Sequence, residues 1–539
     1  MNTTPEVGAM NDERKFGRDA VHSALVVRRS AFRVPCSSFA LRRGMALVVV
    51  LVVVALLSLA GYTFAELMLA EHQAADAHGR ALQARMFCES GVETGLNLLA
   101  LDATLLRERG GLYDNPAELR GVPIVDGAHP AERGRFSIVA PLYEPDAPTT
   151  LRFGLEDESA KLNLNELLAQ QEDEARQQAR LMHLPGMTEA AADSILDWLD
   201  PDDEPRPLGA EADYYSGLSP PYAPANGPLR TLDELLLVQG VTPELLYGLD
   251  ANRNGFADPR ELNAALPEGV TNDDGAFDRG WSRYLTIYGA EPNLTSAGAP
   301  RIDINGDDLE QLFAELQASE QAALATFIIT YRQSGAYTGS RQPSLAPPPA
   351  PDFSKPARYK FATLLDLVGA KTSATVDGDV RVLVSPIVDD PLSLGTSLDG
   401  LFDALTTDGD AVIRGRVNIL QAPREVLSGI AGLTEEQVEQ ILLLRFPEPT
   451  EEMAGSNHPT WLVTSGVATL DEMKTLLPQM TCRGGVFRAQ VIGYFDDAGP
   501  AARAEVLIDA TSAAPRRLLW KELSHFGRGF DPGTLGALP

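Results

Sequence analysis

A twelve-residue acidic stretch carries the clearest chemical pattern in this sequence. Residues 250–261 read Asp-Ala-Asn-Arg-Asn-Gly-Phe-Ala-Asp-Pro-Arg-Glu, with oxygen donors at positions 1, 3, 5, 9 and 12 and glycine at position 6. Calcium takes about six to eight oxygen ligands, and calcium loops of this length place their donors at this spacing around a sharp glycine turn. The alternative is an Asx-rich turn without a metal. The predicted ligands are Asp250, Asn252, Asn254, the carbonyl of Phe256, Asp258 and Glu261.

A second group of acids lies in a proline-broken loop. Its members are Asp200, Asp202, Asp203, Glu204 and Glu211. Because proline interrupts helices, this segment cannot be helical throughout, and several of its carboxylates can converge on one cation. A solvated acidic loop is the alternative to a second calcium site at Asp200, Asp202, Asp203 and Glu211.

The rest of the sequence gives no support for catalysis. None of the seven histidines stands in a His-Glu-x-x-His pattern, and the chain has no Walker loop and no Gly-x-Ser-x-Gly elbow. The acidic run at residues 303–308 lacks a terminal glutamate, and we interpret it as a helix start, where acids complement the helix dipole. We therefore expect a non-catalytic protein, in which calcium stabilises the fold by binding the folded chain.

An uncharged apolar run at residues 45–65 sets the position of these sites relative to a membrane. As a helix, its 21 residues span a hydrocarbon core of about 30 Å. Residues 1–44 carry eight Lys/Arg against four Asp/Glu, and because basic flanks stay cytoplasmic, residues after about 66 are expected on the other side. The run continues without a helix breaker into an amphipathic segment ending near Leu105, which favours an uncleaved membrane helix with a stalk over a secretory signal.

Length and charge limit the number of domains and the kinds of partner expected for this chain. Its 539 residues, 44% of them hydrophobic, suit about two to four domains. Residues 1–44 have a net charge of +4, so the remainder carries −34 (−30 minus 4). This acidity argues against a nucleic-acid partner, whose phosphates it would repel. Beyond residue 44 only Cys88 and Cys482 remain, and the sequence does not show whether they meet in a disulfide.

Strand-like segments stand on both sides of a helical middle. Alternating patterns occur at residues 135–141, 151–157, 486–495, 501–509 and 516–523. Because unpaired edge strands invite aggregation, we expect these segments to join in one sheet. The predicted fold class is α+β, with an N-terminal membrane helix packed on a small antiparallel sheet and a large inserted helical region.

The helical insertion repeats a pattern three times. Each unit opens with a short Asn/Asp-apolar-Asn phrase and closes with a leucine-rich helix; the openings are at residues 162–165, 303–305 and 417–419, and the closings at 231–235, 361–365 and 468–472. The spacing is uneven, so this is a degenerate triplication. Residues 343–356, rich in proline and alanine, form a predicted linker in the second unit.

Residues 184–188 resemble the turn of a helix-hairpin-helix motif, which can present N–H groups to a DNA phosphate. The acids that follow this turn and the scarcity of Lys/Arg nearby favour a packing turn in a SAM-like helical module instead. A membrane-anchored DNA-binding protein stays as an alternative function.

The N-terminal junction resembles a known family. A basic leader that ends in Arg42-Arg43-Gly44, followed by Met45 at the start of a long helix, is similar to type IV pilins and type II secretion pseudopilins. The resemblance implies that the prepilin peptidase cuts after Gly44 and methylates Met45. The fifth mature position is Val49 where that family usually has glutamate, a departure typical of its K-type minor subunit.

The segment 197–235 makes the resemblance specific. Its Asp-Trp-Leu-Asp-Pro-Asp-Asp-Glu opening, Tyr214-Tyr215 and the closing Leu-Asp-Glu-Leu resemble the helical region of K-type minor pseudopilins of type II secretion, although residues 250–410 form a longer middle than that family has. The resemblance implies a subunit at the pseudopilus tip that assembles with I- and J-type minor pseudopilins. It also implies an inner-membrane anchor, a periplasmic body and calcium in the helical domain. A type IV pilus minor tip pilin is the alternative within this class.

The predicted domain organisation follows from these segments. It comprises a prepilin leader (1–44), a transmembrane and stalk helix (45–105), the first part of a pilin-like sheet (106–160), a first SAM-like module with the acidic and calcium loops (161–265), a second helical module with linkers (266–410), a third SAM-like module (411–480) and the C-terminal strands of the sheet (481–539).

Overall fold

The computed structural model of the chain describes residues 45–142, 151–168, 174–255, 258, 261, 263, 265–267, 270–272, 275, 277–376, 378–447, 458–497 and 499–536. The chain divides into two compact units, residues 1–73 and 74–539. The predicted leader, with Gly44, lies outside the described residues, as do the predicted ligand Phe256 and Pro259, which the sequence predicts in the first turn of a helix after the loop.

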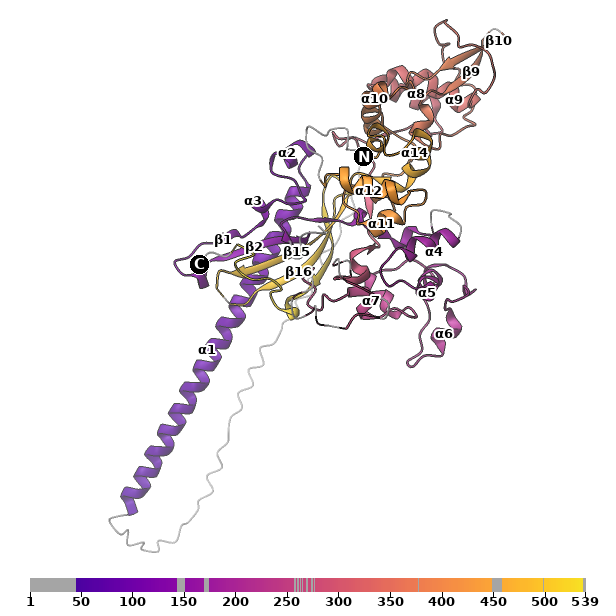
Figure 1. Cartoon of the computed structure of the whole chain (residues 1–539). Coiled ribbons are helices and arrows are strands. Elements are labelled where there is room, and N and C mark those ends of the chain that lie inside the picture. The colour runs from indigo at the N-terminus through magenta and orange to yellow at the C-terminus, as the bar shows by residue number, and fades with distance from the viewer. Residues whose placement is uncertain are drawn as a thin grey trace, which may run out of the picture. The chain divides into compact units, whose positions relative to one another are not determined.

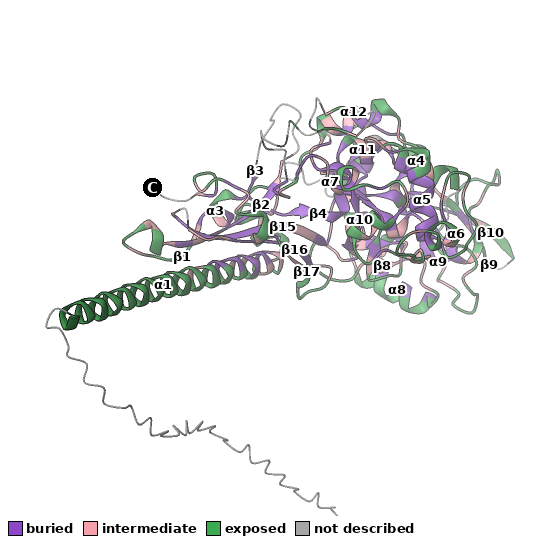
Figure 2. Ribbon diagram, turned by 90° about the horizontal axis from the view of Figure 1, so that it is seen from below, coloured by how far each residue is buried: buried purple, intermediate pink, exposed green. Residues whose placement is uncertain are grey.

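Helix α1 runs from Met45 to Leu99. Of the helices in the described ranges, it alone is long and apolar enough to cross a membrane, with a mean hydropathy of 2.7 in its most apolar window. Its apolar first part is exposed, and its buried residues begin at Ala84 (Figure 2). The helix ends earlier than the predicted Leu105, because Asp102 accepts hydrogen bonds from the N–H groups of Thr104 and Leu105 and so starts a separate helix, α2 (Ala103–Glu108).

An antiparallel sheet draws its strands from both ends of the second unit, as predicted. Its strand order is β1-β2-β15-β16-β17, with β3 beside β2 and β4 beside β15 (Figure 1). The strands are β1 (Val122–Val125), β2 (Gly134–Pro141), β3 (Leu151–Arg152), β4 (Glu156–Asp157), β15 (Val486–Phe495), β16 (Ala502–Asp509) and β17 (Arg516–Glu522). The prediction of a single strand at residues 151–157 is wrong, because this segment forms two short strands with different partners. Strand β3 pairs with β2, whereas β4 pairs with β15.

The last turns of α1 pack closely on the sheet through two glycines. A Cβ at Gly91 would lie 2.5 Å from Cγ1 of Val491, and a Cβ at Gly493 would lie 2.0 Å from the carbonyl oxygen of Ala84. Only glycine permits this approach, which lets the Cys88 thiol donate to the carbonyl of Val491 at 3.2 Å. The core under the helix is one continuous apolar cluster of helix and strand side chains.

Three short parallel bridges close three helical modules. They pair β5 (Leu162–Asn163) with β6 (Leu285–Thr286), β8 (Ile302–Asp303) with β11 (Leu405–Thr406), and β13 (Val417–Asn418) with β14 (Met480–Thr481). We call residues 162–286, 302–406 and 417–481 the first, second and third module. The three opening phrases predicted from sequence are thus the first strands of three equivalent bridges.

Equivalent side chains hold the modules together internally. The amide of Asn165 exchanges two hydrogen bonds with the backbone of Leu229, and Asn305 does the same with Phe361. Arg332 in the second module donates to the carbonyl of Ile304 at 2.8 Å, and Arg445 in the third donates to that of Ile419 at 3.3 Å. Each of these arginines ties the end of a helix back to its module's opening strand.

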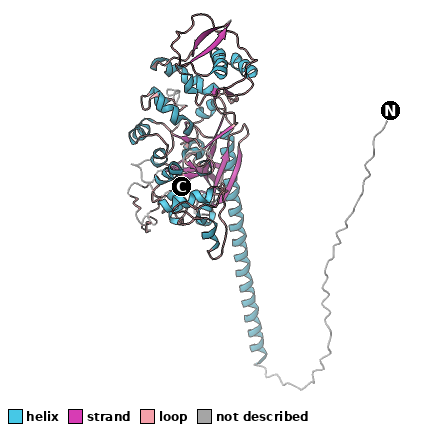
Figure 3. Ribbon diagram, turned by 90° about the vertical axis from the view of Figure 1, so that its right-hand side faces the viewer, coloured by secondary structure: helices cyan, strands magenta, loops and turns pink. Residues whose placement is uncertain are grey.

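Short helices fill the modules around one large apolar core (Figure 3). They are α4 (Glu174–Met182), α5 (Glu189–Leu199), α6 (Ala212–Ser216) and α7 (Pro243–Tyr247) in the first module, α8 (Leu309–Ala318), α9 (Ala325–Ser334) and α10 (Pro391–Ala404) in the second, and α11 (Arg424–Ser428), α12 (Glu435–Leu444), α13 (Trp461–Thr464) and α14 (Leu470–Leu476) in the third. The second module adds the hairpin β9 (Lys371–Val376) and β10 (Asp379–Val384), and β7 (Ala290–Pro292) pairs with β12 (Val412–Arg414) between modules. Helix α3 (Pro116–Leu119) precedes β1.

The structure corrects one local prediction and agrees with another. The closing segments of the first and second units are not α-helices but 3-10 helices of six and four residues, η4 (Leu232–Leu237) and η7 (Leu364–Leu367), the form that short helical pieces commonly take. Residues 343–356 form neither helix nor strand, as a linker should. Cys88 and Cys482 are both buried and free, so among the described residues they form no disulfide.

Candidate functional site

The acidic loop, which we define as residues 200–211, leaves helix α5 and enters α6. Asp200 caps the end of α5, and Glu211 immediately precedes α6. One carboxylate oxygen from each of Asp200, Asp202 and Glu211 lies within 4.8 Å of the other two. Asp200 and Glu211 are buried and Asp202 is exposed. The loop therefore gathers three hard oxygen ligands around one point, which is the donor chemistry that calcium prefers.

Several carboxylate oxygens of this loop lack hydrogen-bond partners among the described residues. Oδ1 of Asp200 and both carboxylate oxygens of Glu211 are buried without a hydrogen-bond partner among the described residues. Burial, together with the neighbouring charges of Asp197 and Asp200, raises the pKa of Glu211 to about 7. Burying a carboxylate without partners costs free energy, and a divalent cation would offset this cost by binding all three oxygens.

An arginine provides part of the charge balance. Nη1 of Arg206 lies 2.7 Å from Oδ1 of Asp197 and also bonds Oδ2 of Asp200. Asp197 is buried near the end of α5, three residues before Asp200, and shares Arg206 with it, although it was not among the ligands predicted from the sequence. Its position three residues before Asp200 was the signal that could have found it.

The fourth predicted ligand of the acidic loop is directed elsewhere. Oδ1 of Asp203 accepts a hydrogen bond from Nδ2 of Asn226 at 2.9 Å, and the same amide bonds the carbonyl of Asp202 at 2.8 Å. Asn226 has a positive φ of 42°, a conformation that asparagine tolerates and that aims its side chain back at the loop. The structure therefore brings Asp200, Asp202 and Glu211 together and places Asp203 beside them.

The twelve-residue loop at 250–261 folds around its own carboxylates. Asp250 accepts from the N–H groups of Asn254 (2.9 Å) and Gly255 (2.7 Å), while Glu261 accepts from those of Asn252 (3.0 Å) and Asp258 (2.8 Å). Gly255 has a φ of 98°, as the sharp turn at position 6 requires.

Side chains complete this arrangement. Oδ2 of Asp258 accepts from the amide of Asn252 at 2.7 Å and from that of Asn254 at 3.3 Å, so hydrogen bonds join positions 3, 5 and 9. Oδ1 of Asn252 is buried without a partner among the described residues. Burial raises the pKa of Asp250 to about 7. Among the described residues, the carboxylates of Asp250, Asp258 and Glu261 are not gathered within 4.8 Å of one another as those of the acidic loop are, so the structure does not bring these predicted ligands together around one point.

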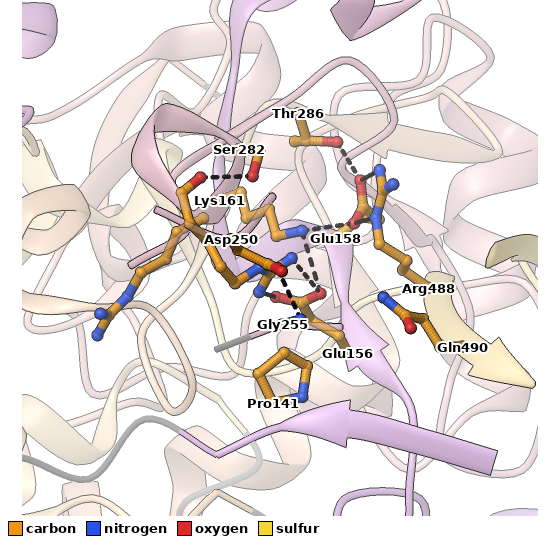
Figure 4. Close-up of polar contacts among 12 residues, drawn as sticks. Pro141, Glu156, Glu158, Lys161, Asp250, Gly255, Ser282, Thr286, Arg488 and Gln490 are labelled. Atoms are coloured by element: carbon orange, nitrogen blue, oxygen red, sulfur yellow. Dashed lines mark hydrogen bonds and ion pairs between the residues drawn. The ribbon is translucent and has the colours of Figure 1, made fainter. Parts of the chain in front are cut away.

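This loop lies between the helical modules and the sheet. A Cβ at Gly255 would lie 2.8 Å from Pro141 at the end of β2 (Figure 4). Gln490 of β15 donates to the carbonyl of Arg253. Nδ2 of Asn254 reaches the carbonyl of Gly529 at 3.0 Å. A cation in this loop would therefore stabilise a junction as well as a turn.

A buried ionic network beside this loop was not foreseen from the sequence. Glu158 is paired with Arg488 at 2.8 Å and with Lys161 at 2.9 Å, and Lys161 also lies 3.3 Å from Glu156 (Figure 4). Thr286 donates to Glu158 as well. The network connects the opening of the first module to its closing strand and to β15, so its parts are more than 120 residues apart and show no local sequence pattern.

The glycine turn of the hairpin-like motif is packed inside the protein. A Cβ at Gly186 would lie 2.6 Å from Cγ2 of Val270. Trp281 also donates its indole N–H to the carbonyl of Pro185 at 2.9 Å. These contacts are what the packing interpretation of the turn requires. Of the weaker acidic run, Asp308 caps α8 by accepting from the N–H groups of Glu310 and Gln311, which is the helix start predicted for it.

Comparisons with known proteins concern the same region. Among solved structures, the chain is similar to one in the crystal structure of the GspK-GspI-GspJ complex from the enterotoxigenic Escherichia coli type 2 secretion system, at 12% identity, with 83% of this chain and 99% of that chain covered and a TM-score of 0.35. No curated protein matches the sequence. Residues 160–250 match the family model described as type II secretion system (T2SS), protein K. This segment holds the acidic loop and most of the first module, so this part of the chain is similar to protein K of type II secretion systems, the family that the sequence resemblance predicts.

Proposed function

We propose that this protein is a non-catalytic K-type minor pseudopilin of the type II secretion pseudopilus. The match of residues 160–250 to protein K is the observation that carries the proposal. The long helix α1, apolar and exposed in its first part and packed on an antiparallel sheet in its last turns, agrees with a pseudopilin subunit. The proposed partners are the I- and J-type minor pseudopilins, with which it would initiate or cap the fibre at its tip.

The proposed location is the inner membrane, with α1 spanning it once and the rest of the body in the periplasm. The charge asymmetry around residues 45–65 supports this orientation. The prepilin peptidase would remove residues 1–44 after Gly44 and methylate Met45, the first residue of α1. Val49 at the fifth position supports a tip location, since the glutamate usual in that family pairs with the subunit above.

The proposed cofactor is structural calcium, held at two sites. The acidic loop would bind it through Asp200, Asp202 and Glu211, with buried oxygens of Asp200 and Glu211 that lack partners among the described residues. The twelve-residue loop would bind it through Asp250, Asn252, Asn254, Phe256, Asp258 and Glu261, and its ligand spacing in the sequence supports this second site. We further propose that the three modules are SAM-like and that they occupy the predicted insertion within a pilin-like sheet. Their shared bridges support a common origin of the three modules.

The N-terminus of the protein isolated from membranes tests the proposal directly. Mass spectrometry should find a methylated Met45 in cells with an active prepilin peptidase and the uncut leader in cells without it. A Gly44→Val variant should stay uncut, whereas a Gly61→Ala variant, altered at an exposed glycine of α1 with open space around it, should be processed normally. An uncut N-terminus in wild-type cells would overturn the assignment.

Partner binding separates the remaining candidates. Co-purification of the full chain with I- and J-type minor pseudopilins from the same cells supports a secretion pseudopilus. Co-purification with type IV pilus subunits instead would favour the minor tip pilin. Retention of DNA that weakens steeply with salt would favour the DNA-binding alternative.

A further inference from the structure

A cavity of about 850 Å³ lies where the three helical modules meet. Its walls include Arg176 on α4 of the first module, Thr363 before η7 of the second and Gln479 before β14 of the third. Strands β7 and β12, which connect the modules, supply Glu291 and Arg414. The volume falls within the range of about 300–1,000 Å³ that small-molecule sites occupy.

The charge of this cavity is opposite to that of the protein. Its charged walls are five arginines and two acids, namely Arg176, Arg301, Arg414, Arg416, Arg483, Glu291 and Asp408. The whole chain has 45 basic residues against 75 acidic ones. An excess of three positive charges in one cavity of such an acidic protein would attract anions, because field lines concentrate in clefts lined by one sign of charge.

Neighbouring groups reflect this positive field. Burial, together with the positive charges of Arg483 and Arg301, lowers the pKa of the His458 imidazole to about 3. Burial, together with the charge of Arg483, lowers the pKa of Arg301 to about 10. At neutral pH His458 is therefore uncharged and the arginines stay charged.

The cavity arginines differ in whether the protein itself pairs them. Arg416 is paired with Glu291 at 2.9 Å, and Arg483 donates to the carbonyl of Leu294 at 2.6 Å, so Arg416 and Arg483 have structural roles. In contrast, neither the guanidinium of Arg414 nor that of Arg301 forms an ion pair with a residue that the structure describes, and Nε of Arg301 is buried without a hydrogen-bond partner there. Arginines that served only to connect loops would have acceptors, as Arg483 does.

We propose that this cavity is a binding site for a small oxyanion-bearing ligand of the phosphate or carboxylate class, held by Arg301 and Arg414. The planar guanidinium donates two parallel hydrogen bonds to such groups, and charge-assisted bonds of this kind are about twice as strong as neutral ones. A ligand in the cavity would touch all three modules and would stabilise their mutual arrangement by binding only the folded chain.

Calorimetric titration of the full-length protein in detergent, at constant calcium, tests the site. The probes are sodium phosphate and sodium succinate, each against sodium chloride of matched ionic strength. We expect saturable binding at one site for one of the two probes, with phosphate binding indicating a phosphate-type ligand and succinate binding a dicarboxylate. Affinity should fall about tenfold in Arg414→Gln and further in the Arg301→Gln/Arg414→Gln variant.

A matched control is Arg358→Gln, which removes an exposed arginine of the second module that does not line the cavity and should bind as wild type does. Arg414 is exposed, so its substitution leaves the folded core intact, and circular dichroism checks this for each variant. No saturable heat beyond that of sodium chloride, or equal affinity in the Arg414→Gln variant and the control, would overturn the proposal.

Discussion

The two candidate calcium loops differ in how well the protein satisfies their carboxylates. In the twelve-residue loop, Asp250 and Glu261 each accept two backbone N–H bonds from the loop itself. In the acidic loop, both oxygens of Glu211 and one of Asp200 have no partner among the described residues. The first loop is organised by its own backbone, whereas the second gathers charges that its surroundings do not neutralise.

This difference indicates where a cation matters most. Hydrogen bonds to a carboxylate favour its charged form, so a loop that provides them keeps its shape without a metal. Carboxylates that lack them repel one another, and in the described part of the chain the basic residue paired with the acids of this loop is Arg206. We therefore expect calcium to stabilise the protein mainly through the acidic loop, and the following experiments test that ranking.

Removing calcium should have the largest effect. Chelation with EGTA should lower the melting temperature of the full chain, because a ligand at about 100 times its dissociation constant stabilises the folded state by about 2.7 kcal/mol. Readdition of calcium should restore the melting temperature, and magnesium should not, since it requires a smaller octahedral site. A melting temperature that EGTA leaves unchanged would contradict structural calcium at both loops.

A Glu211→Gln substitution should abolish most of this calcium effect. With calcium, the variant should be less stable than wild type by about 1–3 kcal/mol, because it lacks a charged ligand. In EGTA at pH 8 the order should reverse, because the variant no longer buries a carboxylate beside Asp197 and Asp200. Differential scanning calorimetry under both conditions measures this reversal.

The matched control is Glu204→Gln, which removes an exposed acid of the same loop and should follow wild type in both conditions. If Glu211→Gln is the less stable protein in EGTA as well, the carboxylate has protein partners and the comparison between the loops fails.

The sequence predicted the chemistry of these loops better than their geometry. Ligand spacing identified residues 250–261 because all the donors are local, but Asp203 turns to Asn226 through a contact 23 residues away. The cavity lined by five arginines had no sequence signal, since these arginines are spread along the chain from Arg176 to Arg483. Strand β15 was predicted at its observed bounds because it alternates over ten residues, whereas the parallel bridges are two residues long.

One sequence signal for the bridges was present and missed. Each closing strand ends in a Thr-x-x-Gly pattern, at Thr286, Thr406 and Thr481. In all three, the threonine hydroxyl accepts from the N–H two residues later, at 3.0, 3.1 and 3.3 Å respectively. The triplication could therefore have been traced at both ends of each module.

The pH dependence of the calcium-free protein sharpens the comparison further. The pKa of Glu211 is raised in the folded chain from 4.5 to about 7, mainly by burial, so the folded state binds more protons than the unfolded state in this window. Stability should then fall as pH rises from about 4.5 to about 7, by about 1–2 kcal/mol after allowance for screening by solvent and Arg206.

Subtracting the pH profile of Glu211→Gln, measured in EGTA, isolates this contribution from that of Asp157 and Asp250, whose pKa values burial also raises. Parallel profiles for the two proteins would show that Glu211 does not titrate in this window.

The smallest effect on stability should come from Asp250→Asn. Asparagine keeps one oxygen that can accept from the N–H of Gly255 or Asn254, so the variant loses about one hydrogen bond, worth about 1 kcal/mol, and it no longer buries a carboxylate. In EGTA its melting temperature should stay close to that of wild type. Equilibrium dialysis should nevertheless count one calcium ion fewer in Asp250→Asn, and also one fewer in Glu211→Gln. If Asp250→Asn keeps the wild-type calcium count, the backbone that organises the twelve-residue loop replaces a metal there, and the acidic loop is the calcium site of this protein.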